Sequence, residues 1–390
     1  MGRFGYEVID ADGHVFETPA MYDLLCREYL PVEHSRALAS LMERARRHYG
    51  TEAIATSQIW GVEGTVPLLA RDRPLGPASE TERVHHPSQG AKDGTEAARD
   101  MLDPHGRLRD MDREGIDVSV IYPSSLASFC ALEDQALETA IYQAYNRWCA
   151  DFCAADPKRL KFVAVFSMRD VEAGVAEAHR AAGDATTLGL YCQTHMGDRQ
   201  LDQPFFDPIW NAAQDLDLPT VIHHASAALP PYGLGVFDMN GNWWLAHAAS
   251  NPFEQMRAIA TMLGGGVFQR FPELRAVYLE AGCGWLPYWL DRLDHHLELM
   301  PYAVPLMKQT ATELFASGRC FVSFDPDEQM LPHTVKHVGD DVLVFASDYP
   351  HFDGAFPDSV RLVAQRDDIT EASKRKLLAE NARRLYPRLG

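Results

Sequence analysis

The sequence has few of the features that would place it in a membrane or on a nucleic acid. No apolar run approaches the roughly 18 residues of a membrane-spanning helix, and the N-terminus has no apolar signal core. Lys and Arg number 36 against 55 Asp and Glu, and the resulting charge of -19 disfavours binding to a phosphate backbone. We therefore expect a cytoplasmic protein that binds a small molecule, with no membrane or nucleic-acid partner.

Cysteine is also scarce, and its spacing excludes the usual cysteine motifs. The seven cysteines are an odd number and include no CxxC pair. Cys149 and Cys153 are four residues apart in a helix-like segment, but no second pair completes a zinc site. We interpret them as reduced cysteines of the core.

The sequence lacks internal repeats and low-complexity tracts, and alternates instead between strand-like and helix-like segments. Amphipathic helical stretches separate most of the strand-like runs, for example 136–154, 171–183, 205–217 and 373–386. Eight such alternations predict an α/β fold, a (β/α)8 TIM barrel, which we expect to form a single domain over residues 1–390. The strand-like runs are rich in β-branched and aromatic residues and cover 6–11, 118–122, 161–166, 187–192, 219–224, 275–280, 319–323 and 342–347.

Two segments interrupt this alternation. About a hundred residues separate the first two predicted strands, and the part at about 50–100 is rich in Gly, Pro, Ser and charge. A shorter insertion at 225–253 carries the pair Trp243 and Trp244. Segments of this kind in enzymes are usually lids or binding loops, so we expect insertions rather than a second domain.

Polar side chains follow several of the predicted strands, at the end of a barrel where catalysis takes place. The first strand ends in Asp10, Asp12 and His14, which alternation would place on one face. A barrel interior does not accept two carboxylates and an imidazole unless a cation neutralises them. The alternative is a simple Asp-Gly turn that closes the strand.

Three further strands end in a potential metal ligand. The fifth ends in His223 and His224, of which only one can point into the barrel mouth. The sixth ends in Glu280 and the eighth in Asp348, whose alternative roles are a carboxylate satisfied by backbone N–H groups and a helix N-cap. Imidazole and carboxylate ligands suit zinc, manganese or iron, and we place zinc first.

These motifs resemble the amidohydrolase superfamily, in its amidohydrolase-related branch, which includes aminocarboxymuconate-semialdehyde and γ-resorcylate decarboxylases. The resemblance implies one divalent ion held by Asp12, His14, His223 and Asp348, with Asp10 behind them. Besides these ligands, it extends over nearly the whole chain, through the segments 108–123, 144–166, 205–224, 266–294 and 342–351.

The sequence departs from this family in two places. The fourth strand has no Lys that could bridge two ions, which favours a single metal. The sixth strand has Glu280 where the related decarboxylases have a His. Glu280 is therefore a general base, a ligand to a second ion or a structural carboxylate.

Three functions remain open at this point. In the first, a hydrolase, Asp348 takes the proton of a metal-activated water that attacks an amide, ester or thioester, and Glu280 assists. In the second, a non-oxidative decarboxylase of an aromatic or unsaturated acid, Asp348 donates a proton to carbon. We rank hydrolysis first because Glu280 replaces the expected His. A catalytically inactive binding barrel ranks last, because all four ligand positions keep metal-competent residues.

The substrate pocket is harder to predict. Arg107 and Arg109 could bind an anionic substrate, although both fit a solvated helix face better. Related barrels are often dimers, which leaves a homodimer as an open expectation. Side chains near the predicted barrel mouth that could line the pocket are Tyr122, His224, Trp243, Trp244 and His351.

Overall fold

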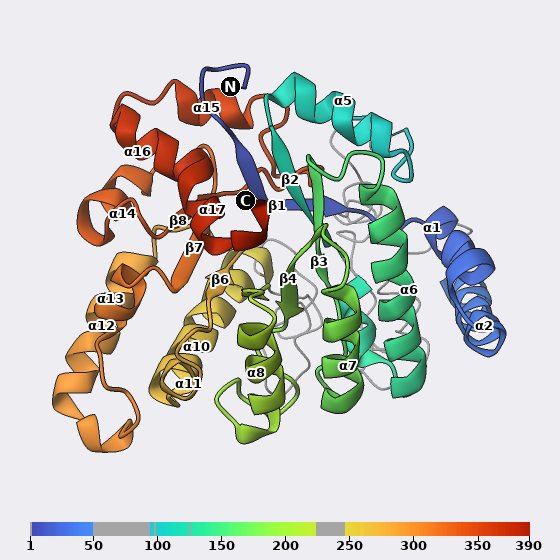
Figure 1. Ribbon diagram of the computed structural model, residues 1–390, viewed down its shortest axis with the longest axis horizontal. Coiled ribbons are helices and arrows are strands. Elements are labelled where there is room, and N and C mark those ends of the chain that lie inside the picture. The colour runs from blue at the N-terminus through green and yellow to red at the C-terminus, as the bar shows by residue number, and fades with distance from the viewer. Residues whose placement is uncertain (1, 50–93, 97–98, 125, 224–245) are drawn as a thin grey trace.

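The computed structural model contains one parallel barrel of eight strands surrounded by helices (Figure 1). It describes residues 2–49, 94–96, 99–124, 126–223 and 246–390. Each strand pairs with the next in sequence order from β1 to β8, which confirms the predicted (β/α)8 fold. The insertion at 50–100 lies almost entirely outside the described residues, as does most of the insertion at 225–253.

All eight predicted strands are present, and several are shorter than their apolar runs. Every strand residue is buried, as expected for a sheet covered on both faces. The strands are β1 (Ile9–Val15), β2 (Val118–Pro123), β3 (Leu160–Ala164), β4 (Thr187–Cys192), β5 (Thr220–Ile222), β6 (Ala276–Tyr278), β7 (Cys320–Phe324) and β8 (Leu343–Phe345).

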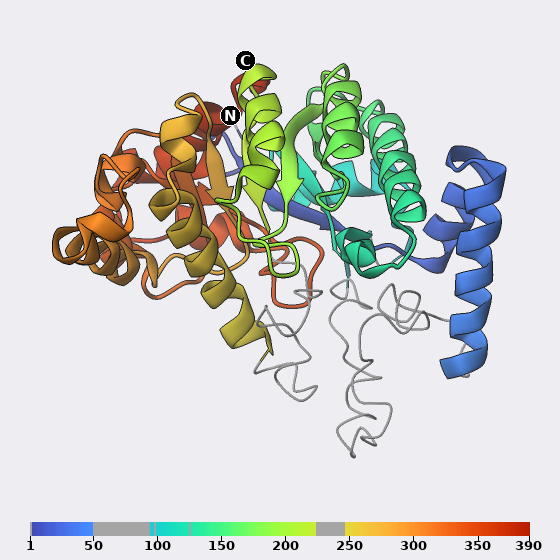
Figure 2. The ribbon, with the colours of Figure 1, turned by 90° about the horizontal axis from the view of Figure 1, so that it is seen from below.

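Helices form the outer layer around these strands (Figures 1 and 2). Local sequence fixes their ends: the Asp103 side chain accepts from His105 N at the start of α5, and Gly115 ends that helix at φ 91°. The principal helices are α1 (Pro19–Leu24), α2 (Val32–Tyr49), α5 (Pro104–Glu114), α6 (Gln135–Cys153), α7 (Val171–Ala181), α8 (Asp207–Asp215), α10 (Asn251–Gly264), α11 (Val267–Arg270) and α12 (Leu286–Leu299). The chain continues with α13 (Ala311–Ala316), α14 (Leu331–Val338), α15 (Ser359–Ala364), α16 (Glu371–Arg375) and α17 (Asn381–Leu385).

The first and last strands join at their C-terminal ends, where the barrel closes. The Asp348 backbone N–H donates to the Asp12 carbonyl at 3.0 Å, and the His14 N–H donates to the Tyr349 carbonyl at 2.5 Å. The residues that follow β8 are therefore held beside the end of β1, which brings two of the predicted metal-binding segments together.

Two further predictions concern the chain as a whole. All seven cysteines are free, and Cys149 and Cys153 are buried in α6, in agreement with their interpretation as core residues. Within the described ranges, we find no helix with the length and apolar character needed to span a bilayer.

Candidate metal centre

The four predicted metal ligands converge at the C-terminal end of the barrel. Asp12 and His14 lie on β1, His223 directly follows β5, and Asp348 lies three residues beyond β8. His14 Nε2 is 3.2 Å from Asp12 Oδ1 and 3.5 Å from Asp348 Oδ1, and His223 Nε2 is 3.8 Å from Asp12 Oδ1. Asp12, His14 and His223 offer three atoms that one ion could contact.

The surroundings of the two imidazoles turn their Nε2 atoms toward this centre. His14 Nδ1 lies 3.1 Å from the Pro123 carbonyl oxygen, and His223 Nδ1 lies 3.4 Å from the Tyr191 hydroxyl. Metal-binding histidines use such contacts to fix the tautomer and the orientation of the ring. Within the described part of the chain, the buried atoms His14 Nε2 and Asp12 Oδ1 have no hydrogen-bond partner. Unsatisfied donors and acceptors this deep are costly unless an ion binds them, so the residues present fit a divalent metal.

Burial sets the charge of these groups when no ion is bound. It lowers the pKa of His14, which keeps the imidazole neutral and able to coordinate a metal. Burial raises the pKa of Asp12 to about 6, against the opposing influence of His223 and His351. The pKa of Asp348 is raised first by burial and then by the neighbouring Asp353 and Asp12 carboxyls. A divalent cation reverses this preference because it stabilises the carboxylate forms.

We therefore expect the affinity for Mn²⁺ to fall as the pH is lowered from about 7 to about 5. For each proton that the ion displaces on binding, the affinity should change by roughly tenfold per pH unit. A proton competes with the cation for Asp12, whose pKa is about 6. Isothermal titration of metal-free protein with Mn²⁺ at a series of pH values would measure the slope. An affinity independent of pH over this range would contradict the involvement of Asp12.

The protonation of Asp12 also affects the stability of the fold. A carboxyl whose pKa is raised by folding stabilises the metal-free fold at low pH, and this contribution is lost as the pH rises through the folded-state pKa, about 6 for Asp12. The increase in Tm caused by Mn²⁺ should therefore be larger at pH 7 than at pH 5.

Glu280, at the end of β6, faces the same centre. Its Oε2 lies 3.1 Å from His223 Nε2 and its Oε1 lies 3.9 Å from His247 Nε2. Glu280 and Asp348 both have positive φ, 55° and 51°, an unfavourable conformation for residues other than glycine that is often found at functional sites. Burial and the Asp348 carboxyl raise the pKa of Glu280 well above its usual value. Both side chains remain partly exposed, 19% for Glu280 and 18% for Asp348, so a ligand can reach them.

The structural interpretation of Glu280 applies instead to a different residue. Glu328, between β7 and α14, accepts the backbone N–H groups of Cys283 and Gly284 at 2.6–3.0 Å. Among the described residues, no backbone N–H donates to the Glu280 carboxylate. Glu280 is therefore available for chemistry or for metal binding.

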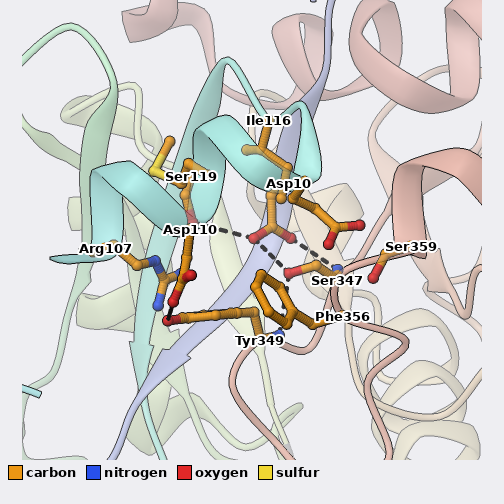
Figure 3. Close-up of a pocket in the computed structure, with 11 residues that line it drawn as sticks. Asp10, Arg107, Asp110, Ile116, Ser119, Ser347, Tyr349, Phe356 and Ser359 are labelled. Carbon is orange, nitrogen blue, oxygen red and sulfur yellow. Dashed lines mark hydrogen bonds between the residues drawn. The ribbon is translucent and has the colours of Figure 1, made fainter. Parts of the chain in front are cut away.

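Asp10 does not share a face with Asp12 and His14, so that prediction was wrong. The pairing of β1 with β2 shifts register between Asp10 and Gly13, and this irregularity breaks the alternation. Figure 3 shows Asp10 beside a small buried void of about 10 Å³, next to Ser119 and Ser347. It accepts hydrogen bonds from Ser347 N at 2.9 Å, Ser347 Oγ at 2.8 Å and Ser119 Oγ at 3.1 Å. Asp10 thus connects β1, β2 and the end of β8 behind the metal centre, as its predicted supporting role requires.

The two arginines proposed for substrate binding have other partners. Arg107 is buried, donates to the His14 carbonyl at 2.6 Å and to Ser119 Oγ at 2.8 Å, and lies over the Tyr349 ring. A Cβ at Gly13 would clash with the Arg107 guanidinium, the Asp10 carboxyl and the Ser119 hydroxyl, so a larger residue there would displace these side chains. Arg109 is exposed and pairs with Glu96 and Asp103, in agreement with a solvated helix face.

Two of the predicted pocket residues, Tyr122 and His351, pack against the candidate ligand His14, and their role in a substrate pocket stays a prediction. Tyr122 is fully buried, and its hydroxyl contacts the Tyr386 hydroxyl at 2.8 Å. His351 Nδ1 lies 2.6 Å from Asp348 Oδ1, and its Nε2 lies 2.8 Å from Ser124 Oγ. With His14 and Asp348, His351 forms a second group of side chains that could hold a metal ion. The other three predicted pocket residues, His224, Trp243 and Trp244, lie outside the described residues.

A cavity of about 240 Å³ opens over Asp12, Glu280 and Asp348. Several residues that line it were not predicted, although one of them, Asp325, directly follows β7 and has the same strand-end signal as His223. They are His247, Asn251, Asp325, Asp327 and Asp353. Asp353 lies two residues beyond the segment 342–351 that contains Asp348. The cavity makes the candidate ligands accessible to a small molecule.

The sequence and the fold of this chain are similar to those of several known proteins. The family model described as amidohydrolase matches residues 9–388. The chain is 25% identical over 305 residues to 2-amino-3-carboxymuconate-6-semialdehyde decarboxylase of Dictyostelium discoideum, covering 76% of this chain and 82% of that protein. It is 23% identical over 296 residues to gamma-resorcylate decarboxylase of Rhodococcus jostii, covering 72% and 86%. A solved 5-carboxyvanillate decarboxylase of Novosphingobium aromaticivorans, with bound manganese, has a TM-score of 0.68, 22% identity and 99% coverage of both chains.

Proposed function

Because this chain belongs to the amidohydrolase family and is an enzyme, we propose that it is a metal-dependent, non-oxidative decarboxylase of an aromatic or unsaturated carboxylic acid. Decarboxylases recur among its relatives, and the site offers the groups that this reaction needs. Hydrolysis, which we ranked first from the sequence, has less support than its decarboxylase alternative. The third alternative, a catalytically inactive binding barrel, is not proposed, because the relatives are enzymes.

The proposed metal ligands are Asp12, His14, His223 and Asp348. Two imidazole nitrogens and two carboxylate oxygens suit manganese, iron or zinc. The bound manganese of 5-carboxyvanillate decarboxylase favours manganese here, and the earlier preference for zinc has no specific support. When bound, the ion would neutralise the substrate carboxylate and an adjacent oxygen and accept the charge that develops on them.

The observation that carries the proposal is the position of Glu280. Its carboxyl lines the cavity, 3.1 Å from the proposed ligand His223, with its pKa raised by burial. A carboxyl that holds a proton beside the substrate can act as a general acid. We assign proton donation to Glu280 rather than to Asp348, because a carboxylate bound to a cation holds no proton to give.

In this proposal Glu280 transfers its proton to the substrate carbon that bears the carboxylate. The bond from that carbon to the carboxylate then breaks, its electron pair returns to the carbon framework, and carbon dioxide leaves. Glu280 becomes a carboxylate and recovers a proton from solvent through the open cavity. The sum is the conversion of a carboxylate and one proton into the decarboxylated product and carbon dioxide.

The experiment is an assay of Mn²⁺-loaded protein on a panel of hydroxylated benzoates and unsaturated acids, with matched methyl esters and anilides. We expect carbon dioxide release and, in D2O, one deuterium at the carbon that lost the carboxylate. Hydrolysis of the esters or anilides without any release of carbon dioxide would reject the proposal and restore the hydrolase.

A further inference from the structure

The turn between β6 and α12, which carries Glu280, has an unfavourable backbone conformation. Glu280 has a φ of 55°, and Gly282, two residues later, has a φ of 60°. Glycine tolerates this left-handed region, but a residue with a Cβ adopts it only where the surrounding structure imposes it. Contacts from outside the turn must therefore hold Glu280 in this conformation.

Glu328, in the segment between β7 and α14, supplies such contacts. Its Oε1 accepts hydrogen bonds from the backbone N–H groups of Cys283 at 3.0 Å and Gly284 at 2.6 Å, and its Oε2 accepts from Cys283 at 2.9 Å. Hydrogen bonds from N–H groups to a carboxylate are about twice as strong as those between neutral groups. These N–H groups directly precede α12, whose N-cap residue, Trp285, makes no side-chain cap hydrogen bond. The carboxylate thus stabilises both the turn and the start of the helix.

The backbone of Glu328 is itself held by neighbouring segments. Its N–H donates to the Asp325 carbonyl at 3.0 Å, and its carbonyl accepts from Arg366 at 3.0 Å. The carboxylate also lies tightly against the turn, because a Cβ at Gly284 would be only 3.0 Å from Glu328 Oε1. Glu328 is therefore fixed firmly enough to determine the conformation of the turn.

The remaining contacts of the turn fix other parts of it. The Glu280 N–H donates to Ser323 Oγ on β7 at 3.1 Å, which anchors the beginning of the turn. Thr334 Oγ1 lies 3.2 Å from the Cys283 carbonyl, and Trp285 Nε1 lies 2.9 Å from two carbonyl oxygens of the turn itself. The end of the turn is tied to the β7–α14 segment through the carboxylate that accepts its N–H groups.

We propose that Glu328 is a positioning residue that holds the β6–α12 turn in the conformation that directs the Glu280 carboxyl toward the metal centre. The inference rests on the proposed function, in which Glu280 donates a proton to carbon. Glu328 is not among the described residues that line the cavity, so it acts through the turn and not on a substrate. A displacement of about 1 Å at a catalytic group can reduce a rate about a hundredfold, so the loss of this carboxylate should be measurable.

The first test is the crystal structure of the Mn²⁺-loaded variant Glu328→Ala, which has no acceptor for the two N–H groups. We expect the turn to relax, so that Glu280 leaves positive φ and its carboxyl moves away from His223 by more than about 1 Å. A carboxyl that stays at its wild-type position would overturn the inference. If this variant does not fold, Glu328→Asp gives the same comparison, because its carboxylate is one methylene further from the turn.

The second test is turnover. Glu328→Ala should reduce kcat at least about tenfold on the acid that the wild type decarboxylates, with KM within about threefold and metal content unchanged. Glu328→Gln should restore most of the turnover, because one carbonyl oxygen can accept both N–H groups, as Oε1 does. The control is Thr310→Ala, which removes the capping box at the start of α13 and should lower the Tm without changing kcat.

A double-mutant cycle separates positioning from general stability. If Glu328 acts through Glu280, adding Glu328→Ala to Glu280→Gln should reduce kcat by less than about a further twofold. A further loss as large as in the wild-type background would overturn the inference, as would an equal loss of kcat in Thr310→Ala.

The two proposals can fail separately, because the crystal structures require no turnover. An unmoved Glu280 carboxyl, together with carbon dioxide release by the wild type, would reject the positioning role and leave the decarboxylase standing. A displaced carboxyl in a protein whose wild type releases no carbon dioxide from any acid would do the reverse.

Discussion

Replacement of His223 with Ala is expected to strip the metal from the protein and to reduce turnover by at least about a thousandfold, because Lewis-acid stabilisation is worth several kcal/mol. His223 Nε2 lies 3.8 Å from Asp12 Oδ1 and 3.1 Å from Glu280 Oε2. Without the imidazole, the buried Asp12 carboxyl and the partly exposed Glu280 carboxyl face each other across a void. Protonation, rather than metal binding, then becomes the favoured way to neutralise them.

The measurement is metal content per chain by inductively coupled plasma mass spectrometry, with turnover and circular dichroism on the same samples. The control variant is His179→Ala, which removes an exposed imidazole from the last turn of α7 and should keep both metal and activity. A folded His223→Ala protein with full metal occupancy would show that the ligand assignment is wrong.

The substitution Glu280→Gln is expected to reduce turnover by about 10²- to 10⁴-fold, the usual contribution of a general acid, while metal content stays at the wild-type level. Glutamine keeps the shape of the side chain and the contact with His223 but has no acidic proton. The pH dependence is a second readout. Since the acid form donates, wild-type activity should fall as the pH rises through the pKa of Glu280 in the loaded enzyme.

Glu273→Gln is the matched control, because Glu273 is exposed and lies near the opposite end of the same strand, before β6. Loss of metal in Glu280→Gln would identify Glu280 as a ligand, and two ions per wild-type chain would then be expected. Unchanged turnover together with unchanged metal content would make Glu280 a structural residue and remove the main support for our proton donor.

The fold was predictable because eight buried strands leave eight apolar runs in the sequence. The convergence of Asp12, His14, His223 and Asp348 followed from one rule, that polar residues at the C-terminal ends of barrel strands share the barrel mouth. The predicted direction of the Asp10 side chain was wrong, because the register of the β1–β2 pairing shifts between Asp10 and Gly13. Alternation along a strand predicts a face only as long as the register is regular.

Side chains that depend on packing between distant segments were not predictable. Arg107 looked like a surface residue on a polar helix, and only the closed barrel reveals that it supports the His14 carbonyl. His247 and Asp327 lie in segments with no periodic pattern, whereas Asp325 directly follows β7 and was within reach of the strand-end rule. Their proximity to Glu280 depends on how the ends of β5, β6 and β7 are arranged around the barrel. The amino-acid composition shows that the chain is acidic, but it does not show that acidic side chains gather at the cavity.

The contacts of Asp10 have a consequence for the order of folding. Asp10 and Ser347, which are 337 positions apart in the sequence, join the first strand to the last. Contacts of such long range carry the largest loop-closure entropy and are expected late in folding. The candidate ligands come from both β1 and the segment that follows β8, so a half-assembled barrel has no complete site for an ion. Metal should then slow unfolding far more than it speeds folding, and the loaded enzyme should be long-lived chiefly for kinetic reasons.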